Sequence, residues 1–155
     1  MAAVTRPGRR GRRGSQFVEA GLALLPFCAL LLLVVDTGWG LFVKSTLQHA
    51  VREGVRFGIT GRITDGVGHV SSIRSVVKNQ AMGLLNGAQG AAIAVRFYDS
   101  GTLAVTGSSA GGNLLEVSVE NYSFNPLGPL LRSNHAISIT VRDADLMEPS
   151  PVATP

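Results

Sequence analysis

The sequence is poor in cysteine and in charge, and both shortages restrict what the chain can be. Its one cysteine, Cys28, has no second thiol with which to form an internal disulfide, so it says nothing about the redox compartment. Charged residues make up only 15% of the 155 residues, whereas 45% are hydrophobic and the mean hydropathy is +0.26. A soluble domain of this size is usually more charged and less apolar. A membrane segment explains both values and leaves enough chain for one modest domain.

Residues with the spacing of a catalytic or metal site are also lacking. His49, His69 and His135 are scattered without matching cysteines or carboxylates, so we expect surface residues and no metal. The segment Gly107–Gly111 matches the G-x-S-x-G motif of serine hydrolases, but that motif needs a helix after it, and here a strand is predicted. We therefore expect no enzymatic activity and no cofactor. A hydrolase that uses Ser109 remains an alternative.

Positive charge is concentrated at the N-terminus. Five of the 14 basic residues lie in the first 14 positions, which contain no acidic residue: Arg6, Arg9, Arg10, Arg12 and Arg13. After Gly14 there are nine basic and ten acidic residues, so the rest of the chain is nearly neutral. The net charge of +4 therefore belongs to a terminal leader, residues 1–14, and gives no electrostatic case for nucleic acid as a partner.

A long apolar run follows this leader. From Ala20 to Val35 sixteen consecutive residues are uncharged, and with Phe17 before them and Trp39 after them the run is long enough to cross a bilayer, which needs about 20 residues. We predict a transmembrane helix over residues 15–43. Pro26 is compatible with a spanning helix because neighbouring groups can satisfy the carbonyl that it leaves free. Trp39 is expected at the far interface.

The residues on either side of the run predict its orientation in the membrane and whether it is retained in the mature protein. Arginines precede it and only Lys44 follows closely, so the N-terminus should stay cytoplasmic and the rest should face the periplasm or the exterior. Asp36, at the distal end, is expected to be exposed at the outer interface. A cleaved secretory signal peptide is the competing interpretation, but residues 36–42 are bulky where its cleavage site should be small.

Beyond the membrane segment, residues 44–147 are predicted to form an α+β domain. Helical spacing continues the first helix to Gly58 and Gly61 and predicts a second helix from Asp65 to Asn86-Gly87. A period of two then predicts about four antiparallel strands, near residues 93–98, 102–106, 115–120 and 137–142. Each strand has one apolar face, so we expect the second helix to pack on a small sheet. The proline-rich residues 148–155 are expected to be disordered.

The junction between leader and apolar run carries the most specific pattern. Gly14-Ser15 is followed by Glu19 at the mouth of the helix, where an ionised group needs a partner or a purpose. This arrangement resembles a type IV prepilin leader, which is cut after glycine and leaves glutamate at the fifth position. Residues 14 to about 61 resemble the TadE-like pseudopilins of the Flp (Tad) pilus machinery, in Val18-Glu19, Ala23-Leu24-Leu25-Pro26, Gly38-x-Gly40-Leu41-Phe42-Val43 and Leu47–Phe57.

The resemblance implies a pilin-like assembly protein of the bacterial inner membrane. Prepilin peptidase would cut between Gly14 and Ser15, and Glu19 of one subunit would neutralise the new α-amino group of a neighbour. The other partners implied are pilin or pseudopilin subunits, the Tad membrane machinery and the lipid bilayer. One departure is Ala20, where the family usually has an aromatic residue. The alternative is an unprocessed single-pass membrane protein whose outer domain binds another envelope component.

Overall fold

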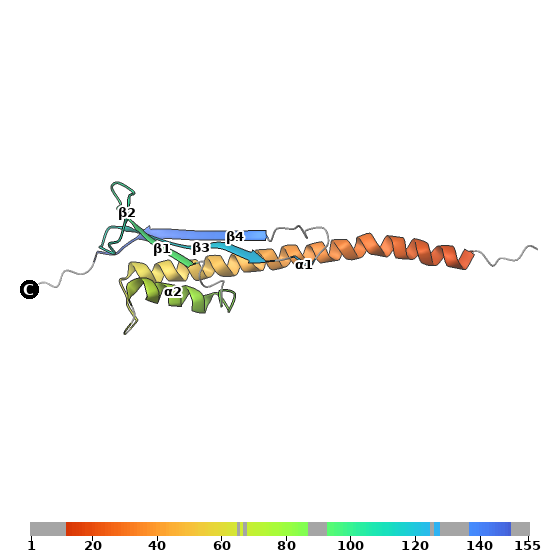
Figure 1. The fold of residues 1–155 in the computed structure, drawn as a ribbon, viewed down its shortest axis with the longest axis horizontal. Helices are drawn as coiled ribbons and strands as arrows, with labels where there is room; N and C mark the ends of the chain where they lie inside the picture. The colour runs from red at the N-terminus through yellow and green to blue at the C-terminus, as the bar shows by residue number, and fades with distance from the viewer. Residues whose placement is uncertain are drawn as a thin grey trace, which may run out of the picture.

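A computed structural model describes residues 12–64, 66, 68–86, 93–124, 126–127 and 137–149, with side chains from Ser15 onward. The elements, in chain order, are α1 (Arg12–Ile59), α2 (His69–Gln80), β1 (Ile93–Tyr98), β2 (Val105–Thr106), β3 (Leu114–Phe124) and β4 (Ile137–Leu146). Figure 1 shows that the sheet and α2 lie beside the second half of α1, whereas the first half projects alone. The predicted α+β fold class, with a long N-terminal helix and a four-stranded antiparallel sheet, is confirmed.

Helix α1 contains both the apolar run and the helix predicted beyond it. Its 48 residues correspond to about 72 Å at 1.5 Å per residue, and it includes Pro26 without a break. The part from Ser15 to Ile59 is long and apolar enough to cross a membrane, and none of its most apolar 18-residue window is buried. Gly61, at φ +63°, follows the last turn, and its N–H donates to the Gly58 carbonyl at 3.0 Å. The prediction that Gly61 ends this helix is therefore confirmed.

The four strands pair antiparallel in the order β2-β1-β3-β4. One face of the sheet is apolar, because the paired positions Ile93↔Val119, Val95↔Val117 and Phe97↔Leu115 carry hydrophobic side chains. The register of β3 and β4 shifts between Val119 and Tyr122, where Asn121 adopts φ +55°. This bulge adds one residue to β3 and so returns Tyr122 and Phe124 to the apolar face.

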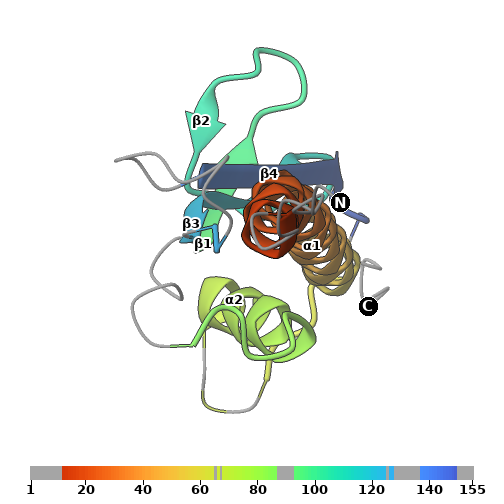
Figure 2. The same cartoon turned by 90° about the vertical axis from the view of Figure 1, so that its right-hand side faces the viewer.

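Both helices pack on that apolar face. Helix α1 runs beneath β3 and β4, and α2 packs against α1 and β1 (Figure 2). The core residues that are fully buried come from every layer: Val43, Leu47, Ala50, Ile73, Val77, Ala81, Leu85, Leu115, Val117 and Val119. Burial of each large aliphatic side chain stabilises the fold by about 1.5–3 kcal/mol. Helix α1 therefore contributes to the core of the domain and also contains the apolar run.

Two glycines let α1 approach its neighbours closely. A Cβ added at Gly54 would collide with Cγ2 of Val77, and one added at Gly58 would collide with Cδ2 of Leu115 and lie 2.9 Å from Cδ1 of Ile73. Gly58 was expected to end the helix, but it lies inside α1 and is buried. Its role is close packing, since the turn itself comes at Gly61.

Helix α2 is shorter than predicted. It begins at His69, with Gly68 as its N-cap, and it ends at Gln80; the predicted N-cap Asp65 and the predicted terminal Gly87 lie outside the described residues. The apolar spacing continues through Ala81 and Leu85, which are fully buried, but the backbone there forms turns. Met82 and Gly83 have positive φ, so the same side-chain spacing is produced without a continuous helix.

The strands also differ in length from the prediction. Strand β2 has two residues instead of five, because Asp99 accepts hydrogen bonds from the backbone and side chain of Thr102 and Leu103 turns at φ +55°. Leu103 and Val105, which form the apolar face predicted for this strand, are 66% and 71% exposed, so that face does not meet the core. Strands β3 and β4 extend beyond their predicted ends, to Phe124 and Leu146.

Candidate functional site at the N-terminal end of α1

The predicted processing site lies in the first turn of α1. Gly14 and Ser15 both fall within the helix, where the backbone frays most readily. Ser15 and Glu19 are four residues apart and therefore share one face. Together with Val18, Leu22 and Ala23 they line a shallow surface groove.

Glu19 is exposed within this apolar groove. It has no ion-pair partner among the side chains that the structure describes, which begin at Ser15. A carboxylate surrounded by apolar side chains and lacking an internal cation can accept a positive charge from outside the subunit. Its position one turn after Ser15 is compatible with pairing to an α-amino group.

The apolar surface that follows is not covered by any other part of the chain that the structure describes. Phe17 is 81% exposed, and every residue from Phe17 to Val35 is exposed or half-exposed. Pro26 lies inside this stretch. Trp39 is 49% exposed, and its ring centroid lies 5.5 Å from that of Phe42.

Asp36 is buried, so the expectation that it is exposed is wrong. The residue is only 5% exposed, and its Oδ1 accepts the backbone N–H of Leu127 at 2.9 Å. The end of the sheet covers this face of α1: a Cβ on Gly40, one turn further on, would lie 3.4 Å from the ring of Phe124. Asp36 therefore joins the end of the apolar run to the chain that follows β3.

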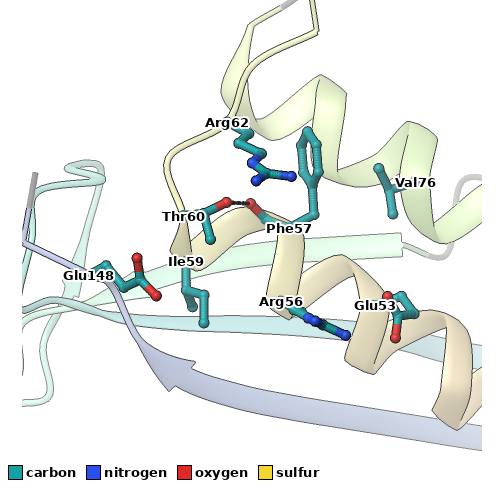
Figure 3. A pocket seen from close by; sticks show the side chains of 8 residues that line it. All are labelled: Glu53, Arg56, Phe57, Ile59, Thr60, Arg62, Val76 and Glu148. Atoms are coloured by element: carbon teal, nitrogen blue, oxygen red, sulfur yellow. Dashed lines mark hydrogen bonds between the residues drawn. The ribbon is translucent and has the colours of Figure 1, made fainter.

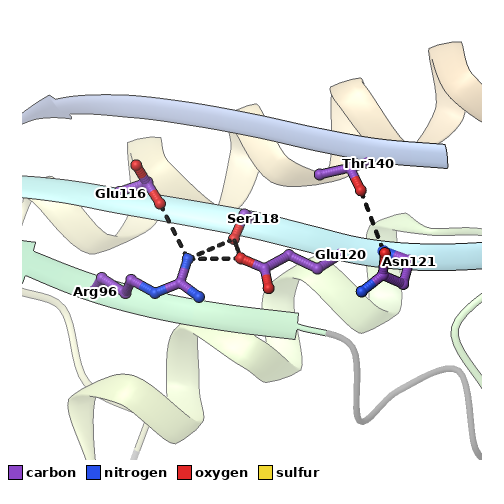
Figure 4. Close-up of polar contacts among 6 residues, drawn as sticks. All are labelled: Arg96, Glu116, Ser118, Glu120, Asn121 and Thr140. Atoms are coloured by element: carbon purple, nitrogen blue, oxygen red, sulfur yellow. Dashed lines mark hydrogen bonds and ion pairs between the residues drawn. The ribbon is translucent and has the colours of Figure 1, made fainter.

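Charged side chains gather on the outer face of the sheet, away from α1 (Figure 4). Arg96 of β1 lies 3.2 Å from Glu116 and 2.6 Å from Glu120, both on β3. The hydroxyl of Ser118 donates to Glu120 at 3.1 Å. Hydrogen bonds from Arg96 and then from Ser118 hold the pKa of Glu120 below its ordinary value of 4.5.

This cluster predicts a small acid sensitivity of stability. Because the folded state lowers the pKa of Glu120, its contribution is present above the unfolded value near 4.5 and is lost as the pH falls through the folded-state pKa. Glu120→Gln should therefore flatten the acid limb of a plot of unfolding free energy against pH. Urea denaturation of the full chain in detergent at a series of pH values measures this. An unchanged acid limb would contradict the stabilising role of ionised Glu120. The control is Glu148→Gln, at an exposed position without an ion pair in the described structure.

A cavity of about 540 Å³ lies at the far end of α1 (Figure 3). Its lining carries charges of both signs, and it comprises Glu53, Arg56, Phe57, Ile59, Thr60, Arg62, Val76 and Glu148. Glu148 reaches it because its N–H donates to the Ile59 carbonyl at 3.0 Å. No local pattern in the sequence indicates this cavity, because its residues come from α1, α2 and the chain after β4.

Ser109 and His69 line one depression of about 290 Å³ together with Phe97. His69 is half-buried: Nε2–H donates to the Gly58 carbonyl at 3.1 Å, and the ring stacks on Phe97 at 6.0 Å, so the prediction of a surface histidine is wrong. His49 is exposed, and His135 lies outside the described residues. Strand β3, and no helix, follows Ser109, so the nucleophile-elbow geometry is absent there. Among the described residues no group of three His, Cys, Asp or Glu could hold a metal ion.

These features define a class of protein: a single apolar N-terminal helix, fit to cross a membrane, that continues into a small α+β head. The match to a known protein family lies in the first of these two parts, the N-terminal helix. Residues 14–56 match the model of the TadE-like protein family, which confirms the resemblance seen in the sequence, and the apolar N-terminal helix fits a membrane-anchored protein. No curated protein and no solved structure matches the chain.

Proposed function

We propose that this chain is a minor pseudopilin, or a structural pilus-assembly protein, of a Tad (Flp) machine. The observation that carries the proposal is the order of features along α1. Gly14-Ser15 and Glu19 stand at the entrance of an exposed apolar stretch, which leads directly into a packed head. The TadE-like match begins at residue 14 and so includes this junction.

The proposed precursor has three parts before its C-terminal tail. Residues 1–14 are a cytoplasmic leader, 15–43 an inner-membrane helix and 44–147 a periplasmic or extracellular domain. The tail was expected to be disordered from residue 148, but Glu148 is held by the Ile59 carbonyl, and residues 150–155 lie outside the described residues. The arginines of the leader favour this orientation. Packing of the head on α1 begins at Asp36, so the head overlaps the last turns of the membrane helix.

The proposed partners follow from the two ends of the chain. Prepilin peptidase releases the leader, and the neighbouring pilin or pseudopilin subunits and Tad membrane proteins contact α1 and the head. Glu19 then receives the α-amino group of Ser15 from a neighbouring subunit, because a buried carboxylate is stabilised only when it is paired. Cleavage is in this way a condition for assembly. The protein acts as a substrate of the peptidase and carries no catalytic residue of its own.

Mass spectrometry of the N-terminus tests the processing step. When the chain is expressed with a prepilin peptidase, the membrane form should begin at Ser15. Gly14→Leu should abolish cleavage, whereas Gly11→Leu, a glycine of the leader away from the junction, should leave it intact. Recovery of Met1 or Ala2 from the mature membrane form would instead support the unprocessed single-pass protein.

The hydrolase alternative rests on Ser109 alone. If it were correct, Ser109→Ala would remove an activity that the unmodified protein has. We expect no such loss, because the loop lacks the strand–turn–helix geometry that exposes a nucleophilic serine.

A further inference from the structure

The length of the exposed apolar stretch fixes the height of the head relative to a bilayer. Phe17 to Val35 is 19 residues of uninterrupted helix, which is about 28 Å. The hydrocarbon core of a bilayer is about 30 Å thick, and the headgroup layer adds about 5–8 Å on each side. The turns of α1 from Asp36 to Phe42 therefore lie in the outer headgroup layer when the stretch spans the hydrocarbon.

The end of the sheet packs on α1 at this same height. The ring of Phe124 faces Gly40, Pro126 is buried, and the N–H of Leu127 donates to Asp36. These contacts place the end of β3 beside the first turns of α1 that leave the hydrocarbon. The head is thus held at the lipid surface with no spacer between them.

Large apolar side chains at this level remain uncovered by protein. Leu127 is 75% exposed, Leu41 64%, Trp39 49% and Phe42 45%. We call these four residues the collar. The surface of the collar is continuous along α1 with the apolar stretch. It contains the indole of Trp39, a side chain that favours membrane interfaces. The exposed Lys44 comes two residues after Phe42, where its ammonium group can reach a lipid phosphate.

We propose that the head rests on the membrane, with the collar inserted at the boundary between headgroups and acyl chains of the outer leaflet. The occupant is phospholipid, because the collar continues the surface that the span presents to lipid. Asp36 is the positioning residue, since its carboxylate fixes the backbone of Leu127 at that depth. The inference rests on the membrane anchoring in the proposed function, but not on cleavage or assembly.

The single tryptophan makes the test direct. The full chain is placed in phosphatidylcholine–phosphatidylglycerol vesicles, with or without lipids brominated near the headgroup end of the acyl chains, and iodide is the aqueous quencher. The variant W39F/L127W should lose most of its emission to brominated lipid and be shielded from iodide. The control W39F/V105W, at the exposed β2 strand, should show the opposite pattern.

Two outcomes would overturn the collar. Emission from W39F/L127W that iodide quenches and brominated lipid does not would place Leu127 in water. Emission shielded from both quenchers would mean that protein covers the site. The unmodified protein distinguishes a wrong position of the collar from a helix α1 that does not span the membrane. If α1 spans the membrane, brominated lipid must quench the emission of Trp39 itself.

The role of Asp36 has its own readout. In the W39F/L127W background, Asp36→Ala should reduce lipid quenching and increase iodide quenching, whereas Asp36→Asn, which keeps an oxygen acceptor for the Leu127 N–H, should preserve the original pattern. Near-ultraviolet circular dichroism of Tyr98 and Tyr122, both in the sheet, confirms that the head is still folded. Unchanged quenching in a folded D36A protein would refute the positioning role.

Discussion

Gly54→Ala is expected to destabilise the head by about 1–3 kcal/mol, the usual cost of inserting a methyl group into a well-packed core. The new Cβ would collide with Cγ2 of Val77, a β-branched side chain with little rotamer freedom. Ile73 and Val117 lie behind the same site at 3.8 Å, so α2 can move away only by opening the core. Urea denaturation of the full chain in detergent, followed by tyrosine circular dichroism, measures the loss.

The same helix provides a matched control. A Cβ at Gly38 has no heavy atom within 4 Å, so Gly38→Ala adds a better helix former in open space. It should leave stability unchanged or raise it slightly. If both variants lose the same stability, the loss at Gly54 does not come from close packing against Val77.

Glu19→Ala is expected to abolish most subunit association while membrane insertion remains normal. The apolar stretch is sufficient for insertion, but the α-amino group of a neighbouring Ser15 then lacks its counter-charge in a medium of low dielectric. Cys28, the single cysteine of the chain, is exposed on the same part of α1 and reports helix proximity. Oxidative crosslinking through Cys28 should therefore form dimers in the processed protein and few dimers in the variant.

Two comparisons make this result specific. Glu19→Gln should also fail, because an amide cannot neutralise the amino group, whereas Glu53→Ala, a carboxylate of α1 within the head, should crosslink normally. Fractionation of the membranes shows that each variant is inserted equally. Normal crosslinking and normal pilus output from the Glu19→Ala protein would contradict the electrostatic role.

The local parts of the fold were predictable because their signals are local. The apolar stretch needs only length and hydropathy to be recognised, and the alternation in β1 and β3 reflects which face of each strand meets the core. The end of α2 was not predictable in this way. Ala81 and Leu85 keep helical spacing, but the positive φ values of Met82 and Gly83 replace the helix by turns that tertiary packing favours.

The residues of the candidate site also fall into two groups, those recognisable from their neighbours in the sequence and those whose partners are far away in the chain. Gly14, Ser15 and Glu19 are recognisable because they are close in sequence, and residues 14–56 carry the family match for the same reason. Asp36 was expected to be exposed, since its partner Leu127 is 91 residues away along the chain. His69 likewise bonds to the carbonyl of Gly58 on another helix, a contact that no local pattern indicates.

The sequence by itself determined that this protein has a basic N-terminal segment, an apolar helix long enough for a bilayer and an α+β head, because charge, hydropathy and side-chain period are properties of neighbouring residues. Only the tertiary structure decided where the head meets the helix. Burial of Asp36 depends on the chain that follows β3, and the close approach at Gly54 depends on α2; both segments fold back along α1 from later in the chain.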